Sequence, residues 1–110
     1  MPPRKGATVM PPEPLSQKEI EERLAELPGW SLDGDRITRV YRLADHFAAT
    51  ALVIHIAQVQ EELGHHSDLT LGYNTVALAV NTHSAGGAVT EQDFELARRV
   101  EALAPGHGVR

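Results

Sequence analysis

The order of the secondary structure is decided by residues 45–80, DHFAATALVIHIAQVQEELGHHSDLTLGYNTVALAV. The first half of this stretch carries apolar side chains at the 3.6-residue spacing of a helix, from Ala48 to Leu63. Asp45 is a preferred N-cap residue, and Gly64 suits the left-handed conformation that ends many helices. The spacing therefore predicts a long helix between Asp45 and Gly64.

The second half of the stretch changes to the two-residue alternation of β-strands. Apolar side chains alternate with others over residues 69–73 and again over residues 76–80. Turn-forming residues lie between the two runs, at positions 72–75. The pattern predicts a β-hairpin directly after the long helix.

Outward from this stretch, two more helices and a second hairpin are predicted. Ser16 has the spacing of a capping box at the start of a first helix, which Pro28-Gly29 ends. Residues 30–43 alternate imperfectly and indicate the second hairpin. Thr90 can cap a last helix that ends before Pro105-Gly106.

The resulting order is helix, two strands, helix, two strands, helix. Strands that come in adjacent pairs joined by short turns favour antiparallel pairing. The predicted fold class is therefore α+β, a four-stranded antiparallel sheet with three helices packed on one face. We expect residues 1–14 to be a disordered Pro-rich leader, residues 15–104 to be one domain, and residues 105–110 to be a flexible tail.

Composition excludes several classes of function. The 110 residues contain no cysteine, which excludes disulfides and thiolate chemistry, and their net charge of −5 disfavours nucleic-acid binding. No apolar run is long enough to span a membrane, and the Pro-rich start lacks the apolar stretch of a secretory signal. We therefore expect a cytoplasmic protein with neither nucleic-acid nor membrane partners.

Three histidines stand out because they lie in predicted connections. His65 and His66 follow the long helix, Glu61 lies one turn before them, and His83 lies at the end of the last predicted strand. Functional groups tend to lie in connections, and imidazoles donate or accept protons near neutral pH. If the two segments meet, the three rings surround one cleft that suits acid/base chemistry without a metal.

The last strand also indicates where a ligand could rest. Continued alternation places Ala77, Ala79, Asn81 and His83 on one face of this strand. The small alanines would leave room for a flat ligand on the side that His83 faces.

Two simpler interpretations stay open at this point. Histidines at the C-terminal end of a helix are favourable in the field of its dipole, and His83 could be an ordinary strand-end residue. A shared zinc site is a further alternative, although adjacent ligands diverge in direction. We predict that the remaining histidines are structural or incidental; they are His46, His55 and His107.

These residues resemble a known family, the pterin-4a-carbinolamine dehydratases, also called 4a-hydroxytetrahydrobiopterin dehydratases. The resemblance covers roughly residues 15–104 and is most specific in the arrangement of Glu61, the His65-His66 pair and His83. Further matching motifs are Pro28-Gly29-Trp30, Arg42-Leu43-Ala44-Asp45, Tyr73-Asn74 and Thr90-Glu91-Gln92-Asp93.

The resemblance implies the α+β fold described above, in dimers that can pair into tetramers. It implies loss of water from 4a-hydroxytetrahydropterin to give quinonoid dihydropterin, in pterin recycling and without a cofactor. His65, His66 and His83 would share the acid and base roles. Residues implied to hold the pterin or to orient a histidine are Glu61, Asn81, Thr82 and Asp93.

The sequence departs from the family pattern near the histidine pair. Ser67 stands where the family usually has proline, whose ring fixes φ, so we expect a looser His66. Leu69 and its neighbours replace common aromatic residues, so the substrate need not be biopterin itself. An alternative function is a catalytically weak or inactive member that acts as a protein-interaction or assembly module.

Overall fold

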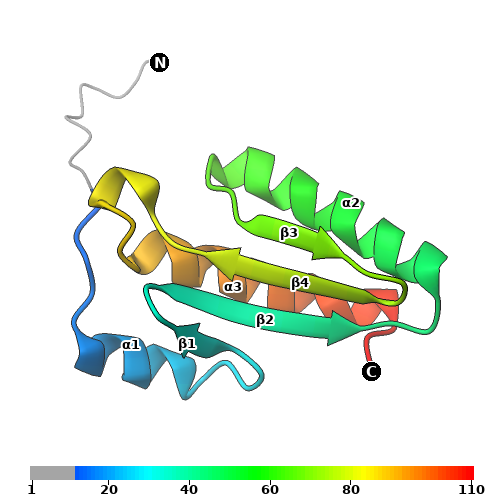
Figure 1. Ribbon diagram of the computed structural model, residues 1–110, viewed down its shortest axis with the longest axis horizontal. Coiled ribbons are helices and arrows are strands. Elements are labelled where there is room, and N and C mark those ends of the chain that lie inside the picture. The colour runs from blue at the N-terminus through cyan, green and yellow to red at the C-terminus, as the bar shows by residue number, and fades with distance from the viewer. Residues whose placement is uncertain (1–11) are drawn as a thin grey trace.

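Three α-helices and four strands make up residues 12–110, the part of the chain that the computed structural model describes (Figure 1). Most of the predicted leader, residues 1–11, lies outside this part. The elements are α1 (Gln17–Leu24), β1 (Ser31–Asp33), β2 (Arg36–Arg42), α2 (His46–Leu63), β3 (Asp68–Leu71), β4 (Thr75–Val80), the 3₁₀ turn η1 (His83–Ala85), α3 (Glu91–Leu103) and the 3₁₀ turn η2 (Ala104–His107).

The four strands form one antiparallel sheet in the order β1-β2-β4-β3. Each hairpin supplies one inner and one outer strand, and β4 pairs with β2 in a register that sets Ala77 opposite Val40. The α+β class and the order of elements predicted above are confirmed. The pairing of β2 with β4 leaves β1 and β3 as the edge strands.

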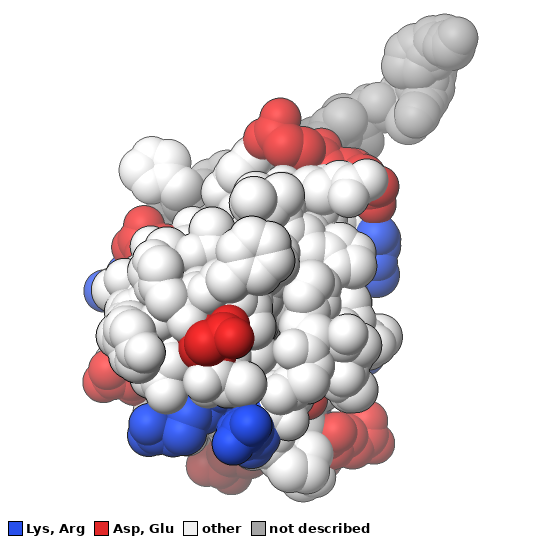
Figure 2. Space-filling model, turned by 90° about the vertical axis from the view of Figure 1, so that its right-hand side faces the viewer, with Lys and Arg blue, Asp and Glu red and all other residues white. Residues whose placement is uncertain are grey.

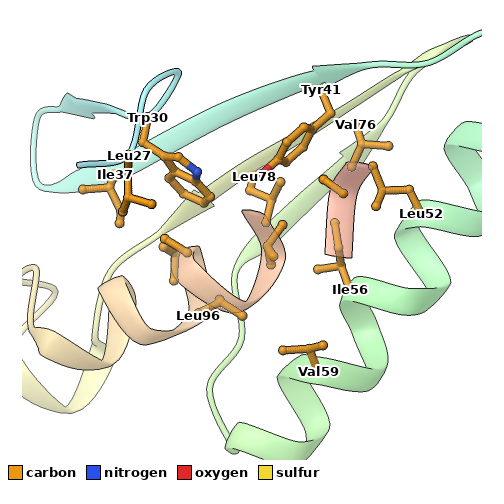
Figure 3. Close-up of a cluster of buried hydrophobic side chains, with 14 of the residues drawn as sticks. Leu27, Trp30, Ile37, Tyr41, Leu52, Ile56, Val59, Val76, Leu78 and Leu96 are labelled. Atoms are coloured by element: carbon orange, nitrogen blue, oxygen red, sulfur yellow. The ribbon is translucent and has the colours of Figure 1, made fainter. Parts of the chain in front are cut away.

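The core lies between the sheet and the helices. Burial alternates along β4, where Val76, Leu78 and Val80 are buried and the residues between them are only half-buried. Figure 3 shows Leu52 and Ile56 of α2 pointing towards this layer. Each helix contributes to the same buried cluster, through Ile20 of α1, Leu52 and Ile56 of α2, and Phe94 and Val100 of α3.

Side-chain caps define the helix ends, as predicted. The Ser16 hydroxyl accepts from the backbone N–H of Glu19, whose carboxylate accepts from the N–H of Ser16. Asp45 caps α2 by accepting from the N–H of Ala48, at 2.8 Å. Such a cap stabilises a helix by about 1 kcal/mol.

One carboxylate ties α3 to the first hairpin. Glu101 accepts hydrogen bonds from Trp30 Nε1 at 2.9 Å, from Arg39 Nε at 2.9 Å and from the Tyr41 hydroxyl. Burial alone would raise the pKa of Glu101, but the donors at Tyr41, Arg39 and Trp30 together lower it. Burial first, and then Glu101, raise the pKa of Tyr41.

The predicted tail, residues 105–110, folds back onto the domain. Part of it lies in η2, and the Arg110 N–H donates to the Arg42 carbonyl at 2.8 Å. Val109 packs against the core. These contacts hold the end of the chain beside the sheet.

Large apolar side chains remain exposed on α2 and at the β3–β4 turn. Phe47 is 83% exposed, Ile54 66% and Tyr73 76%. Figure 2 shows a largely uncharged surface on the side of the molecule at the right of Figure 1. None of the helices within residues 12–110 is both long and apolar enough to span a lipid bilayer.

Candidate active site

A hollow of about 350 Å³ lies where the end of α2, the segment after β4 and the start of α3 meet. All three histidines singled out in the sequence line it, so two separate stretches of chain bring their imidazoles to one open cleft. The lining residues are Gly64, His65, His66, Asn81, Thr82, His83, Ser84 and Gln92. The predicted Asn81 and Thr82 thus belong to this cleft.

The left-handed conformation of Gly64 directs the histidine pair out of the helix. Its φ is 65°, as predicted for the end of α2, and a Cβ there would meet open space. The His65 N–H then donates to the Gln60 carbonyl at 3.1 Å. The helix therefore ends in a turn that delivers His65 and His66 to the cleft.

His65 is held by a buried carboxylate. Its Nε2 lies 2.5 Å from Asp93 Oδ1, and the two side chains are 11% and 0% exposed. The other oxygen of Asp93 accepts from the Thr90 N–H at 2.8 Å and from the Thr82 hydroxyl at 3.0 Å. An ionised carboxylate only accepts, so with Asp93 ionised Nε2 of His65 donates this hydrogen bond and Nδ1 is the ring nitrogen that Asp93 leaves free.

His66 has a looser partner. Its Nε2 lies 2.6 Å from Glu61 Oε2, and both side chains are more than half exposed. Exposed pairs of this kind contribute little to stability. Glu61 is not among the residues that line the cleft; its carboxylate contacts the ring of His66, which does line it.

His83 does not lie at a strand end, which corrects the expectation from the sequence. The strand β4 ends at Val80, and His83 is the first residue of η1. A backbone bridge between Thr82 and Ala88 closes the loop that carries it. His83 is exposed, and within residues 12–110 its ring makes no hydrogen bond.

The alanine face of β4 is not part of the histidine cleft, so this expectation was wrong. Ala77 and Ala79 line a second hollow, of about 460 Å³, on the outer face of the sheet, together with the Arg36–Asp68 ion pair. The alternation of β4 stops with the strand, so the path of the chain after Val80 carries His83 to a different surface.

Ser67 is anchored by hydrogen bonds, and the looser His66 expected from the sequence stays a prediction. Its N–H and its hydroxyl both donate to Oε1 of Gln60, at 3.0 Å and 2.5 Å. Gln60 is only 4% exposed. Hydrophobic spacing along the helix does not predict that a glutamine is buried there.

Sequence reasoning missed three residues of the cleft, Gly64 as a lining residue, Ser84 and Gln92. Gln92 lies in the first turn of α3, between the Thr90 cap and Asp93. The predicted cap at Thr90 could have indicated Gln92, because the first residues of a helix that begins beside a cleft lie near that cleft.

Outside the cleft, His55 and His107 form a pair. Nδ1 of His55 lies 2.8 Å from Nε2 of His107, which joins α2 to η2. Among the described residues, no group of three or more His, Cys, Asp or Glu side chains is arranged to hold a metal ion.

Comparison with known proteins agrees with this arrangement. A family model described as "Pterin 4 alpha carbinolamine dehydratase" matches residues 13–103. A Streptomyces avermitilis protein named "Putative pterin-4-alpha-carbinolamine dehydratase" is 82% identical over 99 residues, which are 90% of this chain and 98% of the relative. A protein of the same name from Chloroflexus aurantiacus is 48% identical over 89 residues, 81% of this chain and 95% of the relative.

Two solved structures share the fold. A transcriptional coactivator/pterin dehydratase from Brucella melitensis superposes with a TM-score of 0.77 at 35% identity, over 83% of this chain and 98% of the other. A pterin dehydratase-like protein identified as a RuBisCO assembly factor in the alpha-carboxysome superposes with a TM-score of 0.56 at 21% identity, over 68% and 86%. The second likeness shows the fold alone. From the family model and these relatives, the chain belongs to the pterin-4a-carbinolamine dehydratase family.

Proposed function

We propose that the protein catalyses the dehydration of a 4a-hydroxytetrahydropterin to quinonoid dihydropterin. The observation that carries the proposal is the convergence of His65, His66 and His83 on one open cleft. Membership of the dehydratase family supplies the substrate class.

The reaction needs two proton transfers. The C4a–O bond breaks as a proton reaches the departing hydroxyl, which leaves as water, and a ring nitrogen of the pterin loses a proton. The electron pair of that N–H bond forms the new double bond to C4a, so nothing is oxidised or reduced overall. Imidazoles donate and accept protons near neutral pH, so they suit both transfers. General acid or base catalysis by a positioned side chain typically accelerates a reaction by about 10²–10⁴-fold.

The contacts support a distinct task for each side chain. We assign the proton transfers to His65, His66 and His83, which all reach the cleft. Asp93 positions His65, and Glu61, which the resemblance placed at the pterin, takes the corresponding place behind His66. We assign the polar edge of the pterin to the backbone at Asn81 and Thr82, as the family resemblance implies; both residues line the cleft.

We propose that the reaction uses neither a cofactor nor a metal, because it moves only protons and water. We also propose that it serves cytoplasmic recycling of a pterin cofactor, as the family resemblance implies. We also propose a homodimer or homotetramer. The exposed Phe47 and Ile54 of α2, and the edge strands β1 and β3, offer surfaces for self-association.

The test is a direct assay of purified protein on freshly generated 4a-hydroxytetrahydropterin, with EDTA present. We expect formation of the quinonoid product, followed by its absorbance, to exceed the spontaneous rate in proportion to protein concentration. A folded protein that leaves the spontaneous rate unchanged would refute the proposal.

A second candidate is an interaction or assembly module on the same fold. It is favoured by the largely uncharged surface of Figure 2 and by the large apolar side chains that stay exposed, Phe47, Ile54 and Tyr73. It predicts that the folded protein is inactive in the same assay and that replacing His83 has no consequence for its function.

A further inference from the structure

Gln60 holds the chain on both sides of His66. Its backbone carbonyl accepts from the N–H of His65 at 3.1 Å. Its side-chain Oε1 accepts from both the N–H and the hydroxyl of Ser67, at 3.0 Å and 2.5 Å. One residue of α2 therefore restrains the backbone immediately before and immediately after this histidine.

His66 depends on this restraint more than His65 does. The ring of His65 is fixed by Asp93, which is fully buried. Among the described residues, the His66 ring has one hydrogen-bond partner, the exposed carboxylate of Glu61, and an exposed pair does little to fix a side chain. The backbone on either side of His66 is consequently the better restrained part of this residue's surroundings.

At position 67, hydrogen bonds to Gln60 restrain the backbone where a proline ring would otherwise restrain it. A proline there would fix φ covalently but would have no N–H to donate. Ser67 lacks that ring, and its N–H and hydroxyl instead both donate to Oε1 of Gln60, which restrains it. A buried amide is unfavourable without partners, so its place in the core is explained by those bonds.

We propose that Gln60 is a positioning residue that holds His66 in its catalytic orientation by clamping Ser67. This inference rests on the proposed dehydratase function. It goes beyond that function because Gln60 is not among the residues that line the cleft.

The first test compares Gln60→Met with Gln58→Met. Methionine keeps the length of the side chain and removes the acceptor, and Gln58 is exposed on the same helix. We expect Gln60→Met to lower kcat about tenfold with less change in KM, since misplacing a catalytic group slows the chemical step. Gln58→Met should leave both unchanged. Unchanged kcat in folded Gln60→Met would overturn the proposal.

Two double variants separate positioning from general damage. Adding Ser67→Pro to Gln60→Met should restore most of kcat, because proline supplies the restraint by another route. In a His66→Ala background, Gln60→Met should cause no further loss. A further tenfold loss in that background would show that Gln60 does not act through His66.

Amide exchange provides a readout that does not depend on activity. The Ser67 N–H should exchange slowly in the unmodified protein and rapidly in Gln60→Met, whereas the N–H of His66, which has no backbone or side-chain acceptor within residues 12–110, exchanges rapidly in both. If the protein fails the dehydration assay but the Ser67 N–H exchanges slowly, the restraint of Ser67 by Gln60 is supported and the proposed function is refuted. An unprotected Ser67 in active protein refutes the clamp alone.

Discussion

Asp93 Oδ1 lies 2.5 Å from Nε2 of His65, and this contact joins α3 to the segment that follows α2. The carboxylate is fully buried, and its second oxygen accepts from the Thr90 N–H and the Thr82 hydroxyl. The same side chain therefore caps α3 and holds the His65 ring by its Nε2.

Asp93→Asn should separate these two tasks. The amide oxygen of asparagine can still accept from the Thr90 N–H. The NH₂ group that then faces His65 carries no negative charge and cannot stabilise a protonated imidazole. We expect kcat/KM to fall about 10- to 100-fold. Urea unfolding should show a loss of about 1–3 kcal/mol, because a charge-assisted bond is lost. An unchanged kcat/KM would contradict the positioning role of Asp93.

His83→Ala and His66→Ala should each lower the rate of dehydration by a factor of about 10² to 10⁴. Both side chains are exposed, so their free energy of unfolding should change by less than about 0.5 kcal/mol. His46→Ala is the matched control, since His46 is exposed and lies outside the cleft. Full turnover in both test variants would remove the assigned roles.

Glu101→Leu should destabilise the fold without altering the chemistry. It leaves Trp30, Arg39 and Tyr41 without their common acceptor in a partly buried site. We expect a loss of about 2–4 kcal/mol, measured by urea unfolding, with kcat retained at temperatures where the protein stays folded. The exposed Glu95→Leu on the same helix is the control and should have little effect.

Stability should fall on acidification through the His55–His107 pair. Burial, followed by the charge of His55, lowers the pKa of His107 below its ordinary 6.5. As pH drops below about 6.5, the unfolded chain binds the proton first, so the free energy of unfolding decreases until the folded-state pKa is passed. Urea unfolding between about pH 5 and 7.5 checks this, and His107→Gln should flatten the slope. An equally steep slope in that variant would assign the effect to other groups.

Much of the fold was predictable because its signals are local. The caps at Ser16, Asp45 and Thr90 involve residues two or three positions apart, and Gly64 ends its helix through its own φ. Helix and strand periodicity follow from the geometry of a single element. The order of helices and strands was therefore correct before any long-range contact was known.

The candidate site was predicted as a set of residues but not as a geometry. The positions of His65, His66 and His83 in connections marked them, and the structure brings all three to one cleft. The alanine face was misplaced because alternation was extended past Val80, where β4 ends. Nothing in the spacing indicated that the chain would turn there.

The sequence by itself determined the type and order of the elements, because caps and periodicity depend on residues close together along the chain. It also marked three histidines as candidates, because they lie in the predicted connections. Only the tertiary structure decided that β2 pairs with β4, that Glu101 collects three donors from the first hairpin, and that Asp93 lies behind His65. Those contacts join residues 28 or more positions apart. They form when packing of the core brings whole elements together, and no local spacing encodes that arrangement.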